Sequence, residues 1–153
     1  MEPHNFQAKR TSLLAAATAF CNCFANKKDT SEILTAHFSS AHNDDIIVLE
    51  HGLPQLAPFL GRPFRGLDGA RMYFGIISNC LSYDGMHFSN YVVDPVTSQV
   101  SVRGEAQFRW KDTGQSWDEV FTYVLAFDEE TKVLKYEIWA DSGAAYMARK
   151  GLL

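Results

Sequence analysis

Carboxyl groups and large aromatic side chains share one stretch of the chain, residues 117–141, in a pattern that could support acid–base chemistry. Two apolar runs joined by a polar turn predict a β-hairpin there. Pairing Phe127 with Val133 across the turn places Tyr123 opposite Glu137. One face of this hairpin then carries Glu119, Phe121, Tyr123, Glu137, Trp139 and Asp141. A carboxyl group on such a face either lies in water at a rim or is held in a pocket, where burial makes it an acid or a base near neutral pH.

The register of the hairpin decides what its two faces do. In the register given above, the second face is smooth and apolar, with Val120, Thr122, Val124 and Ala126 beside Leu134, Tyr136, Ile138 and Ala140. No helix is left to cover this face, and an exposed apolar face usually packs against a second copy of the chain. We therefore predict a homodimer through the outer face of the sheet. A shift of one residue at the turn would separate Tyr123 from Glu137.

Length and charge restrict the class of protein. At 153 residues the chain is expected to form a single domain, residues 1–153, with a sizeable core. A net charge of -4 without a dense run of Lys and Arg disfavours binding to nucleic acid or to a membrane surface. No segment is apolar for long enough to span a bilayer. Aromatic residues make up 13% of the chain, and such residues line cores and some ligand cavities.

The cysteines and the N-terminal region indicate where the protein resides. Cys21, Cys23 and Cys80 are odd in number and lack the spacing of a disulfide framework, which fits a reducing compartment and predicts a cytoplasmic protein. Residues 9–24 begin with basic side chains and continue with a short apolar segment, as a secretory signal does. Their apolar residues recur at helical spacing, however, which favours an amphipathic helix packed on a core.

The rest of the pattern predicts helices first and a sheet afterwards. Apolar spacing indicates further helices starting at Ser31, Asp68 and Ser142. Gly104 marks a predicted bulge or bend, and the Pro- and Gly-rich loop 52–66 is a candidate lid. Strands are predicted at residues 46–51, 86–93, 100–110, 116–127 and 133–141. This order predicts an α+β fold in which helices cover one face of a curled antiparallel sheet and enclose a pocket.

Three segments resemble the NTF2-like superfamily, and within it the SnoaL-like branch of polyketide cyclases and fungal meroterpenoid cyclase and isomerase relatives. They are IIVLEHG at 46–52, FRGLDGARMYF at 64–74 and VLKYEIWADSGAAYMARKG at 133–151. The resemblance implies the NTF2-like cone, in which N-terminal helices pack on a curled sheet around a pocket. It identifies a fold better than a reaction, because this superfamily contains many enzymes and many members without activity.

Enzymes of this superfamily generally work without a cofactor, through acid and base groups in an apolar cone. The resemblance to ketosteroid isomerase places a base at the end of the first strand, where this chain has Glu50 and His51. It places an oxyanion donor at Tyr123. The helix-1 tyrosine of that enzyme has no counterpart here, which disfavours steroid-type isomerisation.

A second resemblance, to limonene-epoxide hydrolase, implies that Arg103, Glu105 and Glu137 act together. Arg103 and Glu105 share a face with Glu137 if Trp110 pairs with Ser116, and a shift of one residue turns both toward solvent. The family's terminal acid corresponds to Asp141. A cap on the last helix is the alternative role for Asp141.

The sequence therefore predicts a cofactor-independent isomerase, cyclase or dehydratase that acts on a hydrophobic polycyclic metabolite of secondary metabolism. The expected catalytic residues are His51, Glu50, Tyr123, Glu137, Arg103, Glu105 and Asp141. The expected contacts to a small hydrophobic substrate are Phe59, Tyr73, Phe121, Trp139 and Trp117. No metal site is predicted, because the histidines lack ligand spacing on one element. The alternatives are an epoxide hydrolase and a non-catalytic, dimeric binding protein whose cone is filled by side chains.

Overall fold

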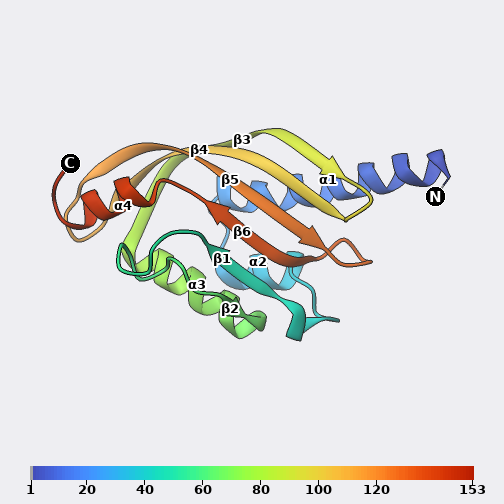
Figure 1. The fold of residues 1–153 in the computed structure, drawn as a ribbon, viewed down its shortest axis with the longest axis horizontal. Helices are drawn as coiled ribbons and strands as arrows, with labels where there is room; N and C mark the ends of the chain where they lie inside the picture. Colours follow the sequence, from blue (N-terminus) through green and yellow to red (C-terminus); the bar gives the residue numbers. More distant parts are fainter. Residues whose placement is uncertain (1) are drawn as a thin grey trace.

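Helices and a single curled sheet form two layers in the computed structural model, which describes residues 2–153 (Figure 1). The helices are α1 (Pro3–Ala25), α2 (Thr30–His37), α3 (Gly66–Cys80) and α4 (Ser142–Arg149), with the 3₁₀ helix η1 (Asn43–Asp45). The strands are β1 (Ile47–Glu50), β2 (Phe64–Arg65), β3 (Leu81–Asp94), β4 (Gln99–Trp110), β5 (Ser116–Phe127) and β6 (Val133–Trp139). Within this part of the chain no helix is both long and apolar enough to cross a bilayer. The expected α+β class is confirmed.

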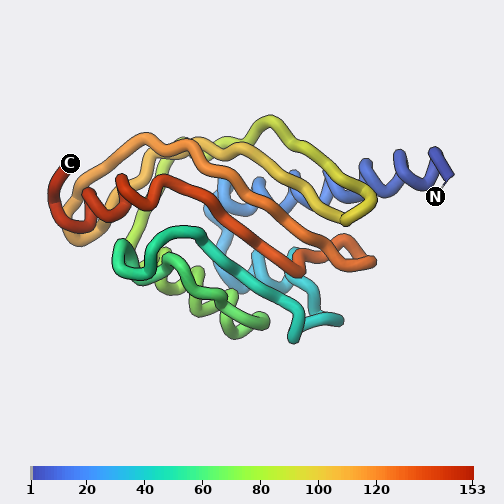
Figure 2. Tube along the Cα trace, in the orientation of Figure 1, coloured from blue at the N-terminus to red at the C-terminus, as the bar shows by residue number. Residues whose placement is uncertain are grey.

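The sheet has the strand order β2-β1-β6-β5-β4-β3. Strands β3 to β6 form the predicted antiparallel meander. Strand β1 is parallel to β6, so the sheet is mixed, and the predicted antiparallel pairing does not hold for these two strands. Helices α1, α2 and α3 lie on the same face of the sheet, while the long strands arch over them (Figures 1 and 2). This arrangement leaves a concave inner face toward the helices and an outer face without a helix layer.

A one-residue bulge in β6 changes the register that the hairpin turn suggests. Phe127 does pair with Val133, as predicted, but Ala126 pairs with Lys135 instead of Leu134. Every residue of β6 beyond the bulge is therefore displaced by one position. Tyr123 lies opposite Ile138, and the predicted pairing of Tyr123 with Glu137 is wrong.

Bulges also bend β3, whereas β4 runs through Gly104 without a shift in register. Of the predicted bulge or bend at Gly104, the bulge is therefore wrong. The two register shifts fall between Asp84 and His87 and between Ser89 and Val92. Gly104 instead accommodates an aromatic ring, because a Cβ atom added there would lie 2.2 Å from Phe121 Cε2.

We expect Gly104→Ala to destabilise the protein, because the ring of Phe121 would have to leave its position in the core. Overpacking of this kind costs about 1–3 kcal/mol, measurable as a lower midpoint in urea unfolding. Gly75→Ala is the matched control, since nothing lies within 4 Å of a Cβ atom at Gly75 on the exposed side of α3. An alanine there favours the helix by up to about 1 kcal/mol. Equal stability of Gly104→Ala and the natural protein would contradict this packing.

Candidate active site

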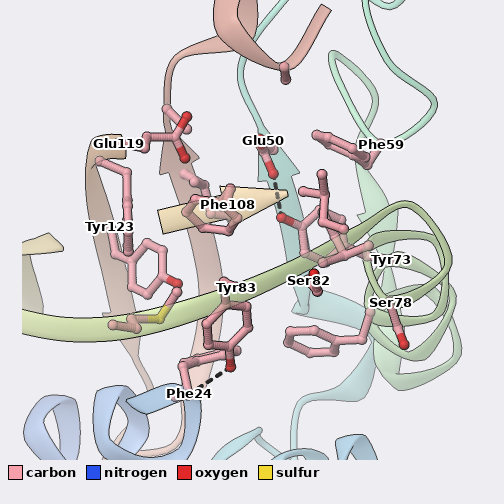
Figure 3. A pocket seen from close by; sticks show the side chains of 18 of the residues that line it. Phe24, Glu50, Phe59, Tyr73, Ser78, Ser82, Tyr83, Phe108, Glu119 and Tyr123 are labelled. Carbon is pink, nitrogen blue, oxygen red and sulfur yellow. Dashed lines mark hydrogen bonds between the residues drawn. The ribbon is translucent and has the colours of Figure 1, made fainter. Parts of the chain in front are cut away.

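A cavity of about 460 Å³ lies between the helices and the concave face of the sheet. Its walls are mainly aromatic, with Phe24, Phe59, Phe74, Phe108, Trp117 and Phe121 among them. Phe24, Phe59 and Phe108 are labelled in Figure 3. Exposed polar residues of the lining, Lys27, Lys28, Asp29 and Ser78, lie on the α1–α2 turn and near the end of α3, and mark the opening to solvent. A pocket of this size with few polar groups suits a small hydrophobic molecule.

Glu50 is the first of two buried glutamates in this cavity. It is the last residue of β1, and the alternation along that strand turns it inward after the buried Val48. Only 7% of Glu50 is exposed, and the Tyr73 hydroxyl of α3 donates a hydrogen bond of 2.6 Å to its Oε1. Burial raises the pKa of Glu50 to about 8, although the Tyr73 hydrogen bond acts in the opposite direction. Glu50 can therefore exchange a proton near neutral pH.

Glu119 is the second buried glutamate, on the inner face of β5. It is 8% exposed. Its Oε1 accepts hydrogen bonds from Trp117 Nε1 at 3.2 Å and from the backbone N–H of Asp141 at 2.9 Å. Burial raises the pKa of Glu119 to about 7, and the charge of Glu119 adds to the rise at Glu50. Figure 3 shows Glu50 and Glu119 directed into the same cavity from two different strands.

Buried tyrosines complete the polar lining. Tyr73, Tyr123 and Tyr136 all border the cavity and are almost fully buried. Burial holds the pKa of each phenol well above its usual value. These hydroxyl groups therefore stay protonated over the physiological pH range and can serve as hydrogen-bond donors.

Seven of the predicted site residues border the cavity: Glu50, Phe59, Tyr73, Trp117, Phe121, Tyr123 and Asp141. Asp141 has a structural role as well, since its carboxylate accepts a hydrogen bond of 2.9 Å from Ala144 N and caps α4. Its backbone N–H holds Glu119. The helix-cap interpretation of Asp141 is thus confirmed, while its position beside the cavity still allows contact with a ligand.

His51, Glu137 and Trp139 do not border the cavity, contrary to the expectation from sequence. The bulge in β6 turns Glu137 and Trp139 to the outer face, where His51 stacks on Trp139 with ring centroids 4.2 Å apart. His51 Nε2 lies 2.7 Å from Glu137 Oε2, and Lys135 Nζ lies 2.9 Å from Glu137 Oε1. Burial raises the pKa of Glu137, but the hydrogen bonds from Lys135 and His51 outweigh that effect and lower it. Glu137 is therefore an ordinary ionised carboxylate.

Arg103 and Glu105 also lie outside the cavity lining. Ser116 pairs with Arg109 and not with Trp110, which is the one-residue shift that turns both side chains to the outer face. There Arg103 Nη2 donates a hydrogen bond of 2.6 Å to Glu105 Oε1, and His87 Nε2 lies 2.8 Å from Glu105 Oε2. The arrangement implied by the resemblance to an epoxide hydrolase is therefore not assembled inside the cavity.

The structure adds residues that the sequence analysis did not assign to the site. Glu119 is not among the expected catalytic residues, although the alternation of Trp117, Glu119, Phe121 and Tyr123 aligns it with the aromatic wall. Tyr136 was assigned to the opposite face, and only the bulge in β6 brings it inward.

A cluster of possible metal ligands lies at the β5–β6 turn and consists of His42, Asp128 and Glu129. None of the three borders the cavity. The Asp128 carboxylate already accepts hydrogen bonds from Ser39 Oγ at 2.6 Å and from the backbone N–H groups of Glu130 and Lys132 at 2.9 Å. These bonds shape the turn and account for the burial of Asp128.

Comparison with known proteins supports the fold. No family model and no curated protein matches the sequence. Solved structures do match. An NTF2-like protein from Burkholderia xenovorans LB400 has a TM-score of 0.72 at 18% identity, over 91% of this chain and 96% of its own. TerC, co-crystallised with polyporic acid, has a TM-score of 0.72 at 14% identity, over 91% and 98%.

PrhC from Penicillium brasilianum NBRC 6234 has a TM-score of 0.65 at 18% identity, over 94% of this chain and 95% of its own. Other similar structures carry the names SnoaL-like polyketide cyclase or isomerase. The chain therefore has the NTF2-like fold, and the resemblance found in its sequence is confirmed at the level of the fold.

Proposed function

We propose that the cavity is the active site of a cofactor-independent enzyme that isomerises, cyclises or dehydrates a hydrophobic polycyclic metabolite. The observation that carries this proposal is the Glu50–Tyr73 pair, a carboxyl group with a pKa of about 8 in an aromatic cavity. A group with a pKa near the working pH is effective as both acid and base. All three reaction types require such proton transfers.

The polar residues of the cavity have different roles in this proposed reaction. Glu50 moves the proton to and from the substrate, while the Tyr73 hydroxyl fixes the position of its Oε1. Glu119 and Tyr123 face the same space and donate hydrogen bonds to oxygen atoms on which negative charge develops. The aromatic walls exclude water, which strengthens these interactions and keeps the pKa of both carboxyl groups raised.

Two observations favour an enzyme over a binding protein with a closed, side-chain-filled cone. The cavity is open, and it is bordered both by acids and by Tyr123. The similar structures include several that carry the names of polyketide cyclases or isomerases, which are classes of enzyme. Comparative metabolite analysis after deletion of the gene tests the proposal, because the substrate should accumulate. Purified protein should then convert that compound without added cofactor. An unchanged metabolite profile would contradict the assignment.

We further propose that the chain forms a homodimer through the outer face of the sheet. The bulge makes this face less uniformly apolar than predicted, because Lys135 and Glu137 occupy it in place of Tyr136 and Ile138. Large apolar side chains remain exposed on it, with Val120 56% and Trp139 42% accessible. Apolar surface among charged residues is typical of an interface between protein chains.

Val124→Lys should give a monomer in light scattering, because Val124 lies on the outer face of β5 opposite Glu137, and the long charged side chain would prevent close packing of a second copy against this face. Val96→Lys is the matched control, since Val96 is 70% exposed in the β3–β4 turn and away from the strands of this face. The control should stay dimeric. A natural protein that is monomeric at micromolar concentration would refute the proposed dimer.

A further inference from the structure

The two buried glutamates of the cavity, Glu50 and Glu119, are held in the same manner. Glu50 Oε1 accepts a hydrogen bond from the Tyr73 hydroxyl, and Glu119 Oε1 accepts from Trp117 Nε1 and from Asp141 N. An indole or amide N–H can only donate, so Glu119 Oε1 must act as an acceptor. One oxygen of each carboxyl group is thus engaged by the protein.

The other oxygen of each group faces the cavity. Neither Glu50 Oε2 nor Glu119 Oε2 has a hydrogen-bond partner among residues 2–153. No side-chain nitrogen or oxygen in this part of the chain is both fully buried and without a partner. Both Oε2 atoms are therefore accessible from the cavity that the two side chains line, although each residue is more than nine-tenths buried.

The position of the proton follows from these contacts. Burial raises the pKa of Glu50 to about 8 and that of Glu119 to about 7, so both groups bind a proton at pH 6. Because Oε1 accepts hydrogen bonds in each case, the proton resides on Oε2. The other titratable groups that line the cavity are the phenols of Tyr73, Tyr83, Tyr123 and Tyr136 and the side chain of Asp141, with Asp29 at the opening. Lys27 and Lys28 lie only at the opening.

We infer that the ligand is a neutral, largely apolar compound with two acceptor oxygens, such as a diketone or a quinone, which receive hydrogen bonds from Glu50 Oε2–H and Glu119 Oε2–H. This inference rests on the proposed function and specifies the substrate class of the same site. The aromatic walls contact the carbon skeleton, and the two O–H groups determine its orientation. Compounds with the same skeleton and one or no carbonyl group leave one or both donors unsatisfied, which weakens binding.

The test measures binding and needs no substrate. Anthraquinone, anthrone and anthracene share a tricyclic skeleton with two, one and no carbonyl groups, and a second series on a diphenylpropane skeleton places two carbonyl groups closer together. Trp117 lies in the cavity wall, so a bound probe quenches its fluorescence, and this quenching reports the binding of each probe. At pH 6 we expect the diketone of at least one series to bind about tenfold more tightly than its monoketone, the equivalent of about 1.4 kcal/mol.

At pH 9 this preference should disappear, because both carboxyl groups are then ionised and repel a carbonyl oxygen. Glu50→Gln and Glu119→Gln each replace the O–H by an N–H₂ group that donates at any pH, so the double variant should keep the preference at pH 9. Equal affinity of diketone and hydrocarbon in both series at pH 6 would overturn the inference, as would a preference of the natural protein that persists at pH 9. Failure of this test leaves the proposed function standing if Glu50→Gln still abolishes turnover, and the two failures are therefore distinguishable.

Discussion

Glu50→Gln should lower kcat by a factor of about 10² to 10⁴, the range that a positioned acid or base contributes. Glutamine keeps the size of the side chain and an oxygen that can accept the hydrogen bond from Tyr73, but it cannot take or return a proton. The substrate is identified first by the metabolite comparison, and the rate is then measured under saturation. KM should change little, because the cavity keeps its shape.

Glu137→Gln is the matched control for this variant. It makes the same chemical change on the outer face, where Glu137 pairs with His51 and Lys135 and does not border the cavity. Its kcat should stay within about twofold of that of the natural protein. If Glu137→Gln lost activity and Glu50→Gln kept it, the active site would lie on the outer face.

The second large effect concerns stability and pH. A carboxyl group with a raised pKa in the folded state binds its proton more tightly there than in the unfolded chain. The contribution of Glu50 to the stability of the folded protein is therefore largest below pH 4.5, falls as the pH rises, and reaches its lower limit above the folded-state pKa of about 8. The contribution of Glu119 to stability is lost in the same way between pH 4.5 and about pH 7.

Glu50→Gln removes the larger of these two contributions. One pKa unit corresponds to ~1.4 kcal/mol. The free energy of unfolding of the variant, relative to that of the natural protein, should therefore rise by on the order of 4 kcal/mol between pH 5 and pH 9. The measurement is the free energy of unfolding in urea for both proteins at both pH values. Titration of the groups that do not interact with Glu50 cancels in the difference between the two proteins. A difference that is the same at pH 5 and pH 9 would show that Glu50 titrates normally.

The sequence predicts the parts of the site that depend on local alternation. Phe121 and Tyr123 are predicted on one face because side chains alternate along a strand, and the structure has them together with Trp117, an expected substrate contact. Glu50 was found through its position at the end of the first strand, where the resemblance implies a base. Tyr73 follows from the helical spacing of buried residues in α3. These features need no information from distant parts of the chain.

The orientation of β6 depends on contacts that are distant in sequence. Val133 pairs with Phe38 beside α2, and its carbonyl oxygen accepts a hydrogen bond of 3.0 Å from Ser39 N. These contacts hold Val133 in place while the bulge shifts the residues that follow. Within β6, Lys135 and Glu137 alternate with Tyr136 and Ile138, which by itself indicates the orientation that the structure has. The conflict between this alternation and the register counted from the turn is the sequence signal of the bulge.

The register of β4 and β5 is a second feature that the sequence near the turn does not determine. Arg109, and not Trp110, pairs with Ser116, so a shift of one residue moves Arg103 and Glu105 to the outer face. Turn length alone leaves the register open by one residue, and the core decides between the alternatives. Trp110 is 4% exposed and packs near Phe59, a burial that requires the observed register.

The pKa of Glu50 is the property on which the proposed chemistry depends, and carboxyl-carbon NMR measures it directly. Protein labelled with ¹³C at the glutamate side chains is titrated from pH 4 to pH 10, and the resonance of Glu50 is identified by its absence in Glu50→Gln. The buried pair with Tyr73 predicts that this resonance changes with a midpoint near pH 8. A midpoint near pH 4.5 would mean that Glu50 is an ordinary ionised carboxylate, and would contradict its role as the acid and base of the cavity.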